Sequence, residues 1–463
     1  MAKSVVSGAK KNIHQRNFIY HFIHPTVKAQ FFHFYGKMEV YGVDNIPRKA
    51  PVIFAPNHQM ALMDALIVLF KAPQDVVFLA RADIFRKRFL AFLLNSLKML
   101  PVFRQRDGAS ELSKNQEIFD ISVNVLKNRH YLCLMPEGNH GHQRKLRPLV
   151  KGIFRIAFKA QEAHGEEPFV KILPVGMDVG DYIKHNQPLL LHFGKPIEVS
   201  EFWAEYEENN ARAINALRSR LAEEMKPLMI HIGTDEHYEA FMGLRTIFND
   251  RMREIMEIKG RKLEDRFRAD KEMIARLDAA LEKDVEKEEV GVIAGKVGHY
   301  DKRIRELRIR DWVVRDEGYG VGRSVWRFLS LLFTFPVFLF GFITNVVPYL
   351  LPVRLVRNVR DPQFHSSIKV FLAILILFPL YYILLTLLVG IFTGPWWIWL
   401  LFLVSLPFMG KASLVWYLRW KKTVRGSWFN RQVRRKAPDA LELVDLRREI
   451  VGLMDRLMEG MNG

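Results

Sequence analysis

Two long uncharged stretches dominate the hydrophobic pattern, and both lie near the carboxyl end, at residues 328–352 and 370–410. A helix that crosses a bilayer needs about 20 apolar residues. The second stretch is long enough for two such helices, and Gly394-Pro395 interrupts it near the middle. Tryptophan and tyrosine gather at two levels, next to this break and just before residue 421, as aromatic belts do at membrane interfaces. The pattern predicts a transmembrane helical hairpin over residues 370–418.

The first uncharged stretch, residues 328–352, contains three prolines and is followed by a basic loop. The tail at residues 419–463 begins with a long basic run without acidic residues. Positively charged loops stay on the cytoplasmic side, so an even number of crossings keeps both basic segments there. We therefore expect residues 328–352 to be re-entrant or interfacial, and residues 419–463 to form a basic cytoplasmic tail with a C-terminal helix. A third full crossing is the alternative.

The amino-terminal segment, residues 1–37, mixes aromatic residues with His and Lys. This composition is typical of an amphipathic helix that lies in a membrane interface. An aromatic helix of a soluble core would show the same pattern. No long apolar stretch follows the basic residues, so a signal peptide is not expected.

Residues 38–200 alternate short β-rich runs with helical stretches. Such alternation predicts an α/β domain in which helices flank a mixed sheet. Buried strands are expected at residues 51–55, 75–80, 131–135, 172–175 and 189–193, with a helix at 61–70. Residues 201–327 are instead dense in charges of both signs, with apolar residues at helical spacing, and we expect a separate charged helical region there.

The net charge limits the kinds of partner that the protein can bind, and the cysteine content limits its disulfide bonds. The 463 residues include 69 Lys and Arg against 50 Asp and Glu, a formal net charge of +19. This excess favours a negative partner surface: nucleic acid, an anionic membrane or a phosphorylated ligand. Much of it flanks the apolar stretches, so we expect an anionic membrane and no nucleic acid. The single cysteine, Cys133, excludes an intrachain disulfide.

The first candidate for chemistry is the segment Asn57-His58 followed by Asp64, directly after a predicted strand. An imidazole can remove a proton from a hydroxyl group, and a nearby carboxylate holds its tautomer and stabilises its cation. A capping Asn57 beside a histidine that only satisfies a turn is the simpler interpretation of the same residues.

Two further segments carry polar residues after predicted strands. Pro136-Glu137-Gly138-Asn139 follows the strand at 131–135, and Arg104 follows a short apolar run. Four cations come next along the chain, Arg144, Lys145, Arg147 and Lys151. They suit a phosphate, although basic residues on a loop are usually only solvated. His140 and His142 form a His-x-His pair without a third ligand at suitable spacing, so no metal site is expected.

Taken together, these segments resemble the glycerophospholipid acyltransferase superfamily, the PlsC-like enzymes. The resemblance covers roughly residues 30–200 and rests on the order Asn-His…Asp, Val-Phe-Arg, Pro-Glu-Gly and Leu-Pro-Val-Gly, the last around Pro174. It implies that His58 and Asp64 are the catalytic dyad. It also implies that Arg104, Glu137 and Gly138 help to hold a glycerol-phosphate acceptor and that Pro174 lies towards the acyl donor.

Two positions depart from the family pattern. Five residues separate His58 from Asp64, where four are usual, and Asn139 and His140 stand where Thr or Ser and then Arg are usual. The acceptor phosphate is therefore expected to rely instead on Arg144, Lys145, Arg147 or Lys151, with Asn139 as a further substrate-binding residue.

The apolar stretches and their basic flanks, taken with the resemblance, lead us to expect an integral membrane enzyme whose catalytic domain faces the cytoplasm. Its expected reaction moves an acyl group from acyl-CoA or acyl carrier protein to 1-acylglycerol-3-phosphate, with no further cofactor. A polyol-phosphate acceptor such as glycerol-3-phosphate or dihydroxyacetone phosphate, or an amino-acid lipid, is the alternative within the same class. The alternative from another class is a non-catalytic membrane scaffold.

Overall fold

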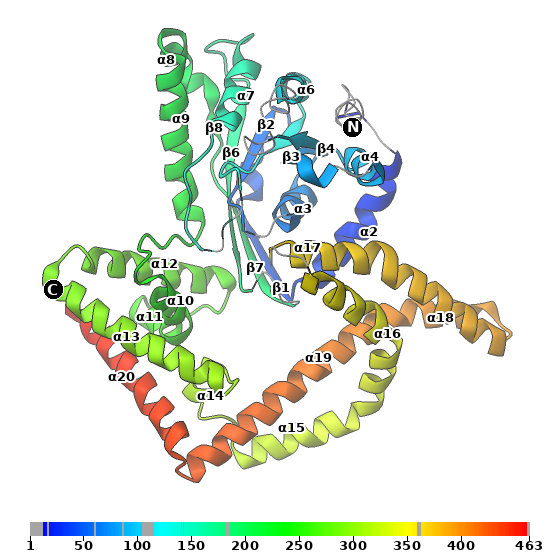
Figure 1. Ribbon diagram of the computed structural model, residues 1–463, viewed down its shortest axis with the longest axis vertical. Helices are drawn as coiled ribbons and strands as arrows, with labels where there is room; N and C mark the ends of the chain where they lie inside the picture. The colour runs from blue at the N-terminus through cyan, green and yellow to red at the C-terminus, as the bar shows by residue number, and fades with distance from the viewer. Residues whose placement is uncertain are drawn as a thin grey trace. The chain divides into compact units, whose positions relative to one another are not determined.

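The computed structural model describes residues 13–15, 18–59, 62–85, 88–103, 115–139, 141, 143–181, 186–358 and 363–460. The chain forms two compact units (Figure 1). The first comprises residues 1–231 with 359–370, and the second comprises residues 232–358 with 371–463.

The first unit is built on a sheet of eight strands in the order β1-β7-β6-β2-β5-β3-β4, with β8 also paired to β6. Strands β2 to β6 run parallel, whereas β7 and β8 run antiparallel to β6, so the sheet is mixed as expected. The strands are β1 (Lys37–Tyr41), β2 (Val52–Pro56), β3 (Val76–Arg81), β4 (Met99–Val102), β5 (Tyr131–Cys133), β6 (Lys171–Val179), β7 (Pro188–Phe193) and β8 (Ile197–Glu198).

The central strands are apolar along their whole length because helices cover both faces of the sheet. All five residues of β2 are buried, and Ile53 pairs with Leu132 of β5 on one side and Ile172 of β6 on the other. Helices α6, α7 and α9 share one hydrophobic core with the sheet, and α3 lies on the opposite side (Figure 1). The helices are α2 (Phe18–Phe34), α3 (Leu62–Lys71), α4 (Arg88–Ser96), α6 (Asn115–Lys127), α7 (Gly152–Gln161), α8 (Trp203–Glu208) and α9 (Asn210–Met225).

The first unit extends to residue 231 rather than ending near residue 200. Helix α9 is charged on its outer side, but Leu217, Leu221 and Met225 are fully buried against the sheet. The part of the charged helical region that precedes residue 232 therefore covers the α/β sheet.

Helix α2 has two different sides. Phe31 is buried and its ring lies 5.1 Å from the ring of Phe70 in α3, while Phe18 and Phe22 are exposed. The helix therefore packs on the first unit and also presents aromatic rings on its surface.

The second unit is entirely helical among the residues that the structure describes. Its C-terminal helix packs on α13, where Lys296 pairs with Glu449 at 2.8 Å and Arg303 with Asp439 at 2.6 Å. Its helices are α10 (Tyr238–Ile247), α11 (Asn249–Ile255), α12 (Leu263–Ala280), α13 (Asp284–Glu306), α14 (Asp311–Arg315), α15 (Val321–Phe333), α16 (Phe335–Leu355), α18 (Phe378–Phe392), α19 (Trp396–Arg434) and α20 (Pro438–Gly460).

Helices α16 and α19 are long and apolar enough to cross a membrane, by length and composition, and α18 is a shorter apolar helix. Helix α17 (Gln363–Leu372) and the π-helical turn at Ala373–Leu377 precede α18. The expected turn of the hairpin lies at residues 393–395, between α18 and α19. The first uncharged stretch is divided at Thr334 between α15 and α16.

Candidate active site

His58 and Asp64 meet at the carboxyl end of β2. The Nδ1 atom of His58 lies 2.8 Å from Oδ2 of Asp64, and the same oxygen accepts a hydrogen bond of 2.8 Å from the backbone N–H of Gln59. Asp64 is fully buried at the start of α3, and the His58 side chain is 13% exposed. A carboxylate at Nδ1 favours the tautomer that carries its proton there, so Nε2 is the nitrogen that can accept a proton.

Asn57 fixes the backbone that carries His58. Its side chain donates to the carbonyl of Met177 at 3.1 Å and accepts from the N–H of Met177 at 2.7 Å, and its own N–H donates to Val175. These three bonds continue the pairing of β2 with β6 beyond the end of β2. Asn57 therefore positions the histidine by bridging two strands, a role that the sequence pattern alone did not reveal.

Glu137 lies beside the dyad because β5 is the neighbour of β2 in the sheet. Its Oε1 accepts the backbone N–H of His58 at 2.9 Å, and its Oε2 accepts from Arg147 Nε at 2.9 Å. Burial raises the pKa of the Glu137 carboxyl, while the bonds from His58 and Arg147 act in the opposite direction. Glu137 thus holds the His58 backbone and one guanidinium in place.

Gly138 provides the sharp turn after Glu137. Its φ of 67° lies in the left-handed region, and a Cβ there would lie 2.8 Å from Cγ1 of Val150. Glycine avoids both costs, since it has no Cβ. Two backbone bonds close this loop, from Gly138 N to Met135 O at 3.1 Å and from Val150 N to Pro136 O at 2.7 Å.

The predicted phosphate-binding residues have different surroundings. Arg144 is buried, and its Nε donates to Asp178 at 3.0 Å while its Nη2 donates to the Val179 carbonyl, so β6 holds its guanidinium. Arg147 is linked to the dyad through Glu137, which accepts hydrogen bonds from the backbone N–H of Arg147 at 3.3 Å, from its Nε at 2.9 Å and from the backbone N–H of His58. Lys145 is half-buried and Asn139 is exposed.

Pro174 and Arg104 are the other predicted site residues. Pro174 is buried within β6, where it pairs in register with Ala55. Arg104, His140 and His142 lie outside the described residues. Among the residues that the structure describes, no group of three or more His, Cys, Asp or Glu side chains could hold a metal ion.

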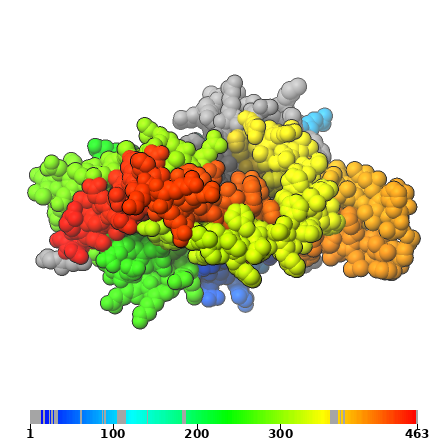
Figure 2. Space-filling model, turned by 90° about the horizontal axis from the view of Figure 1, so that it is seen from below, coloured from blue at the N-terminus to red at the C-terminus, as the bar shows by residue number. Residues whose placement is uncertain are grey.

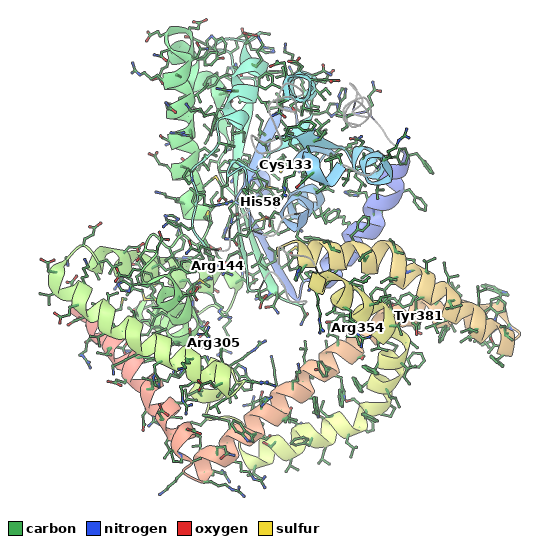
Figure 3. All side chains as sticks on the ribbon, viewed as in Figure 1. His58, Cys133, Arg144, Arg305, Arg354 and Tyr381 are labelled. Carbon is green, nitrogen blue, oxygen red and sulfur yellow. The ribbon has the colours of Figure 1, made fainter. Side chains whose placement is uncertain are left out.

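Cys133 is a potential nucleophile close to the dyad, in the strand next to β2 (Figure 3). It is fully buried in β5, and burial, followed by the charge of Asp64, raises the pKa of its thiol. The thiolate is the reactive form of cysteine, so this residue is held in its unreactive form. The arrangement is therefore suited to general-base chemistry by His58.

The described geometry agrees with the similarity of this domain to known proteins. Residues 37–178 match the family model described as Acyltransferase. A 1-acyl-sn-glycerol-3-phosphate acyltransferase of Borreliella burgdorferi is 24% identical over 201 residues, which cover 42% of this chain and 74% of that protein. The enzyme of the same name from Bacillus subtilis is 21% identical over 189 residues, 41% of this chain and 88% of that protein.

Among solved structures, the chain is similar to the 1-acyl-sn-glycerophosphate acyltransferase PlsC from Thermotoga maritima. The identity is 21% and the TM-score 0.31, covering 44% of this chain and 78% of that one. The family model and the two curated relatives support the glycerophospholipid acyltransferase superfamily for the α/β domain. The chain thus carries an acyltransferase domain, and the family match ends at residue 178.

Proposed function

We propose that this protein is a membrane O-acyltransferase that acylates the free hydroxyl of 1-acylglycerol-3-phosphate to give phosphatidate. The observation that carries the proposal is the 2.8 Å contact between His58 Nδ1 and the buried Asp64, at the carboxyl end of a central strand. The names of the two curated relatives support the choice of acceptor.

In the proposed reaction, Nε2 of His58 removes the proton from the acceptor hydroxyl as its oxygen attacks the thioester carbonyl. Asp64 stabilises the imidazolium that forms. The tetrahedral intermediate then collapses, and the carbon–sulfur bond breaks while the carbon–oxygen bond of the new ester remains. The departing thiolate takes the proton from the imidazolium, which restores the neutral histidine and releases the free thiol of CoA or of acyl carrier protein.

Glu137 and Arg147 are proposed to position this reaction. The Glu137 carboxylate links the backbone of His58 to the guanidinium of Arg147. A guanidinium presents paired N–H donors that match phosphate oxygens. We therefore assign the acceptor phosphate to Arg147, with Lys145, Asn139 and Arg104 as further contacts. Arg144 is assigned a lesser part, because Asp178 and the carbonyls of β6 already engage its guanidinium.

The proposed localisation is an integral membrane protein with its catalytic domain at the cytoplasmic face. Helices α16 and α19 support membrane insertion by their length and composition. Their basic flanks, such as Lys421 and Lys422, support the cytoplasmic orientation of those segments. An enzyme in this position meets both the lyso-lipid acceptor and the acyl chain of the donor at the bilayer into which they partition.

The test is acyl transfer from radiolabelled acyl-CoA to 1-acylglycerol-3-phosphate in membranes that contain the full chain. We expect labelled phosphatidate from the wild type and a loss of at least about 10³-fold in kcat for His58→Ala. His164→Ala is the matched control, because His164 stacks on Phe169 at 3.8 Å, away from the dyad contacts. Full activity of His58→Ala would show that another group is the base.

Alternative acceptors are separated by the same assay. The assay supplies competing acceptors together with 1-acylglycerol-3-phosphate: glycerol-3-phosphate, dihydroxyacetone phosphate and an amino-acid lyso-lipid. In a separate series, acyl-acyl carrier protein replaces acyl-CoA as the donor. Preference for another acceptor would retain the class of reaction and change its substrate. A wild-type chain that transfers acyl groups to none of them would favour the scaffold alternative.

A further inference from the structure

Helix α15 is fixed on α19 by one of its faces. Ser324 and Leu331 are buried on that face. The hydroxyl of Ser427 donates to Ser324 Oγ at 2.7 Å, and the indole N–H of Trp416 donates to the Leu331 carbonyl at 3.0 Å. Arg327 adds a hydrogen bond of 2.9 Å to Thr423 Oγ1. These contacts span the whole of α15.

The other face of α15 is apolar and exposed. Figure 2 shows this helix in yellow-green at the surface of the molecule. Its large apolar side chains are 43% to 87% exposed and recur at helical spacing, at Val321, Val325, Trp326, Phe328, Leu329, Leu332 and Phe333. Soluble surfaces carry single apolar residues and rarely a continuous row of this size. The helix is therefore amphipathic, and its apolar face is stabilised when a partner or a lipid phase removes it from water.

The charged residues of α15 are all cationic. The helix contains no acidic residue, and the guanidiniums of Arg323 and Arg327 lie 4.9 Å and 4.6 Å from the centre of the Tyr319 ring. Helix α19 also lacks acidic residues along its length. A negatively charged surface of lipid headgroups complements these cations.

The level of α15 along α19 matches a membrane interface. Trp416 of α19 stacks on Phe338 of α16 at 4.1 Å and lies 5.9 Å from Phe335. This aromatic group lies between Lys411, the first charged residue of α19, and Arg419, where its closely spaced basic residues begin. Aromatic side chains gather at this depth in membrane proteins. Helix α15 lies on the basic side, between Trp416 and Ser427.

We infer that α15 is an interfacial membrane anchor that runs beside α19, with its apolar face in the boundary between headgroups and acyl chains and with Arg323 and Arg327 at the lipid phosphates. The exposed apolar surface continues from α15 into α16 across the single residue Thr334. A bilayer that surrounds α16 therefore covers α15 as well. The inference rests on the proposed insertion of α16 and α19 and is independent of the acyl acceptor.

The experiment places single nitroxide labels on the full chain in vesicles of phosphatidylcholine and phosphatidylglycerol. Cys133→Ala removes the single native thiol, and cysteines are then introduced one at a time. Leu329→Cys and Leu332→Cys report the apolar face, and Ser330→Cys is the matched control on the polar face. Ile343→Cys in α16 is the reference for depth.

The measured quantities are the collision rates of each label with oxygen, which dissolves in lipid, and with a water-soluble nickel chelate. We expect labels at residues 329 and 332 to favour oxygen several-fold over the label at residue 330, at a depth shallower than the label at residue 343. Equal nickel access at residues 329 and 330 would overturn the proposal in favour of a solvated helix. Low access to both reagents at residues 329 and 332 would overturn it in favour of a protein partner.

The reference label keeps the two proposals distinguishable. A deep label at residue 343 with aqueous labels on α15 means that α16 inserts and only the interfacial anchor is wrong. An aqueous label at residue 343 contradicts the insertion of α16 and the anchor together. Acyl transfer by each labelled protein, measured in the same vesicles, verifies that the chain has folded.

Discussion

Single residues at the carboxyl end of β2 have separate tasks that their positions explain. His58 is aimed by Asp64, its backbone is held by Glu137, and Asn57 ties the segment to β6. Because Asp64 also accepts the N–H of Gln59, the carboxylate fixes both the ring and the turn. The extra residue between His58 and Asp64, relative to the family pattern, does not prevent their contact.

Replacement of Asp64 by asparagine tests how this carboxylate acts. Asp64→Asn keeps the size of the side chain but removes the charge that stabilises the imidazolium, so we expect kcat to fall by roughly 10³-fold to 10⁴-fold. The KM for the acceptor is expected to change little, because Asp64 is fully buried and does not contact it. Steady-state kinetics on membranes measure both quantities. A large rise in KM with an unchanged kcat would contradict a role in orienting the base.

Histidines near the opposite end of the sheet predict a pH dependence of stability. The rings of His14 and His130 stack at 4.8 Å, and the buried Lys98 donates to the His14 carbonyl at 3.0 Å. Burial, followed by the charge of Lys98 for His14 and of His14 for His130, lowers the pKa of each imidazole below 6.5. The folded chain therefore binds fewer protons than the unfolded chain below that pH.

Stability of the wild type is thus expected to be full above about pH 6.5 and to decrease as the pH falls towards the lowered values. His130→Phe keeps a stacking ring without a titrating group, so its unfolding midpoint should fall less between about pH 7 and pH 5. Urea unfolding in detergent at several pH values gives the change of the unfolding midpoint with pH for the wild type and for His130→Phe. An identical change in the two proteins would show that His130 does not contribute.

At the scale of elements, the strand-to-loop-to-helix segments carry the residues of the candidate site, and the sheet order brings them together. The β2–α3 connection supplies His58 and Asp64, and the β5–α7 connection supplies Glu137 and Arg147. These connections meet because β5 is the neighbour of β2, although about 80 residues separate His58 from Glu137. Polar groups at the carboxyl ends of adjacent parallel strands form the usual ligand edge of such folds.

The β5–α7 connection depends on the left-handed backbone of Gly138. Gly138→Ala introduces about 1–2 kcal/mol of backbone strain and a contact with Val150. We expect a lower unfolding midpoint and reduced activity, because Glu137 shifts with the turn. In the double variant Gly138→Ala/Val150→Ala, we expect the loss of stability caused by the contact with Val150 to disappear. The loss caused by backbone strain at residue 138 should remain.

Gly152→Ala is the matched control for that substitution. Gly152 is exposed at the start of α7, and a Cβ there has no neighbour within 4 Å among the described residues. Alanine is a better helix former than glycine, so stability should stay constant or increase slightly. Thermal unfolding and acyl transfer are measured for all four proteins. A Gly138→Ala variant as stable and active as Gly152→Ala would contradict the importance of the turn.

At the scale of the whole molecule, neither unit is a continuous segment of the chain. Residues 359–370 belong to the first unit, and α20 returns to pack on α13 in the second. There Arg447 of α20 donates to Asp311 at 2.8 Å, and Asp311 also accepts from the hydroxyl of Tyr300 at 2.8 Å. The basic C-terminal tail therefore ends in a helix that is part of the second unit.

The apolar helices and the net charge of +19 predict how the protein is held in membranes. At about 1 M salt the Debye length is about 3 Å, which screens attraction between surface charges. Insertion of α16 and α19 does not depend on such attraction, so we expect the full chain to stay in the membrane pellet at high salt and to need detergent for release. Release by salt alone would contradict membrane-spanning helices.

The sequence by itself determined the α/β alternation and the apolar character of the two uncharged stretches, while its resemblance to a known family implied the pairing of His58 with Asp64. Each is a local property, since periodicity, run length and short spacing are set by residues close together in the chain. The tertiary structure alone decided that Glu137 and Arg147 join this pair, that Asp178 holds Arg144, and that α9 covers the sheet. These contacts depend on which strands and helices become neighbours. An apolar face is stabilised by burial against any well-packed neighbour. The hydrophobic pattern therefore does not determine the order of the strands in the sheet or which helix covers which face.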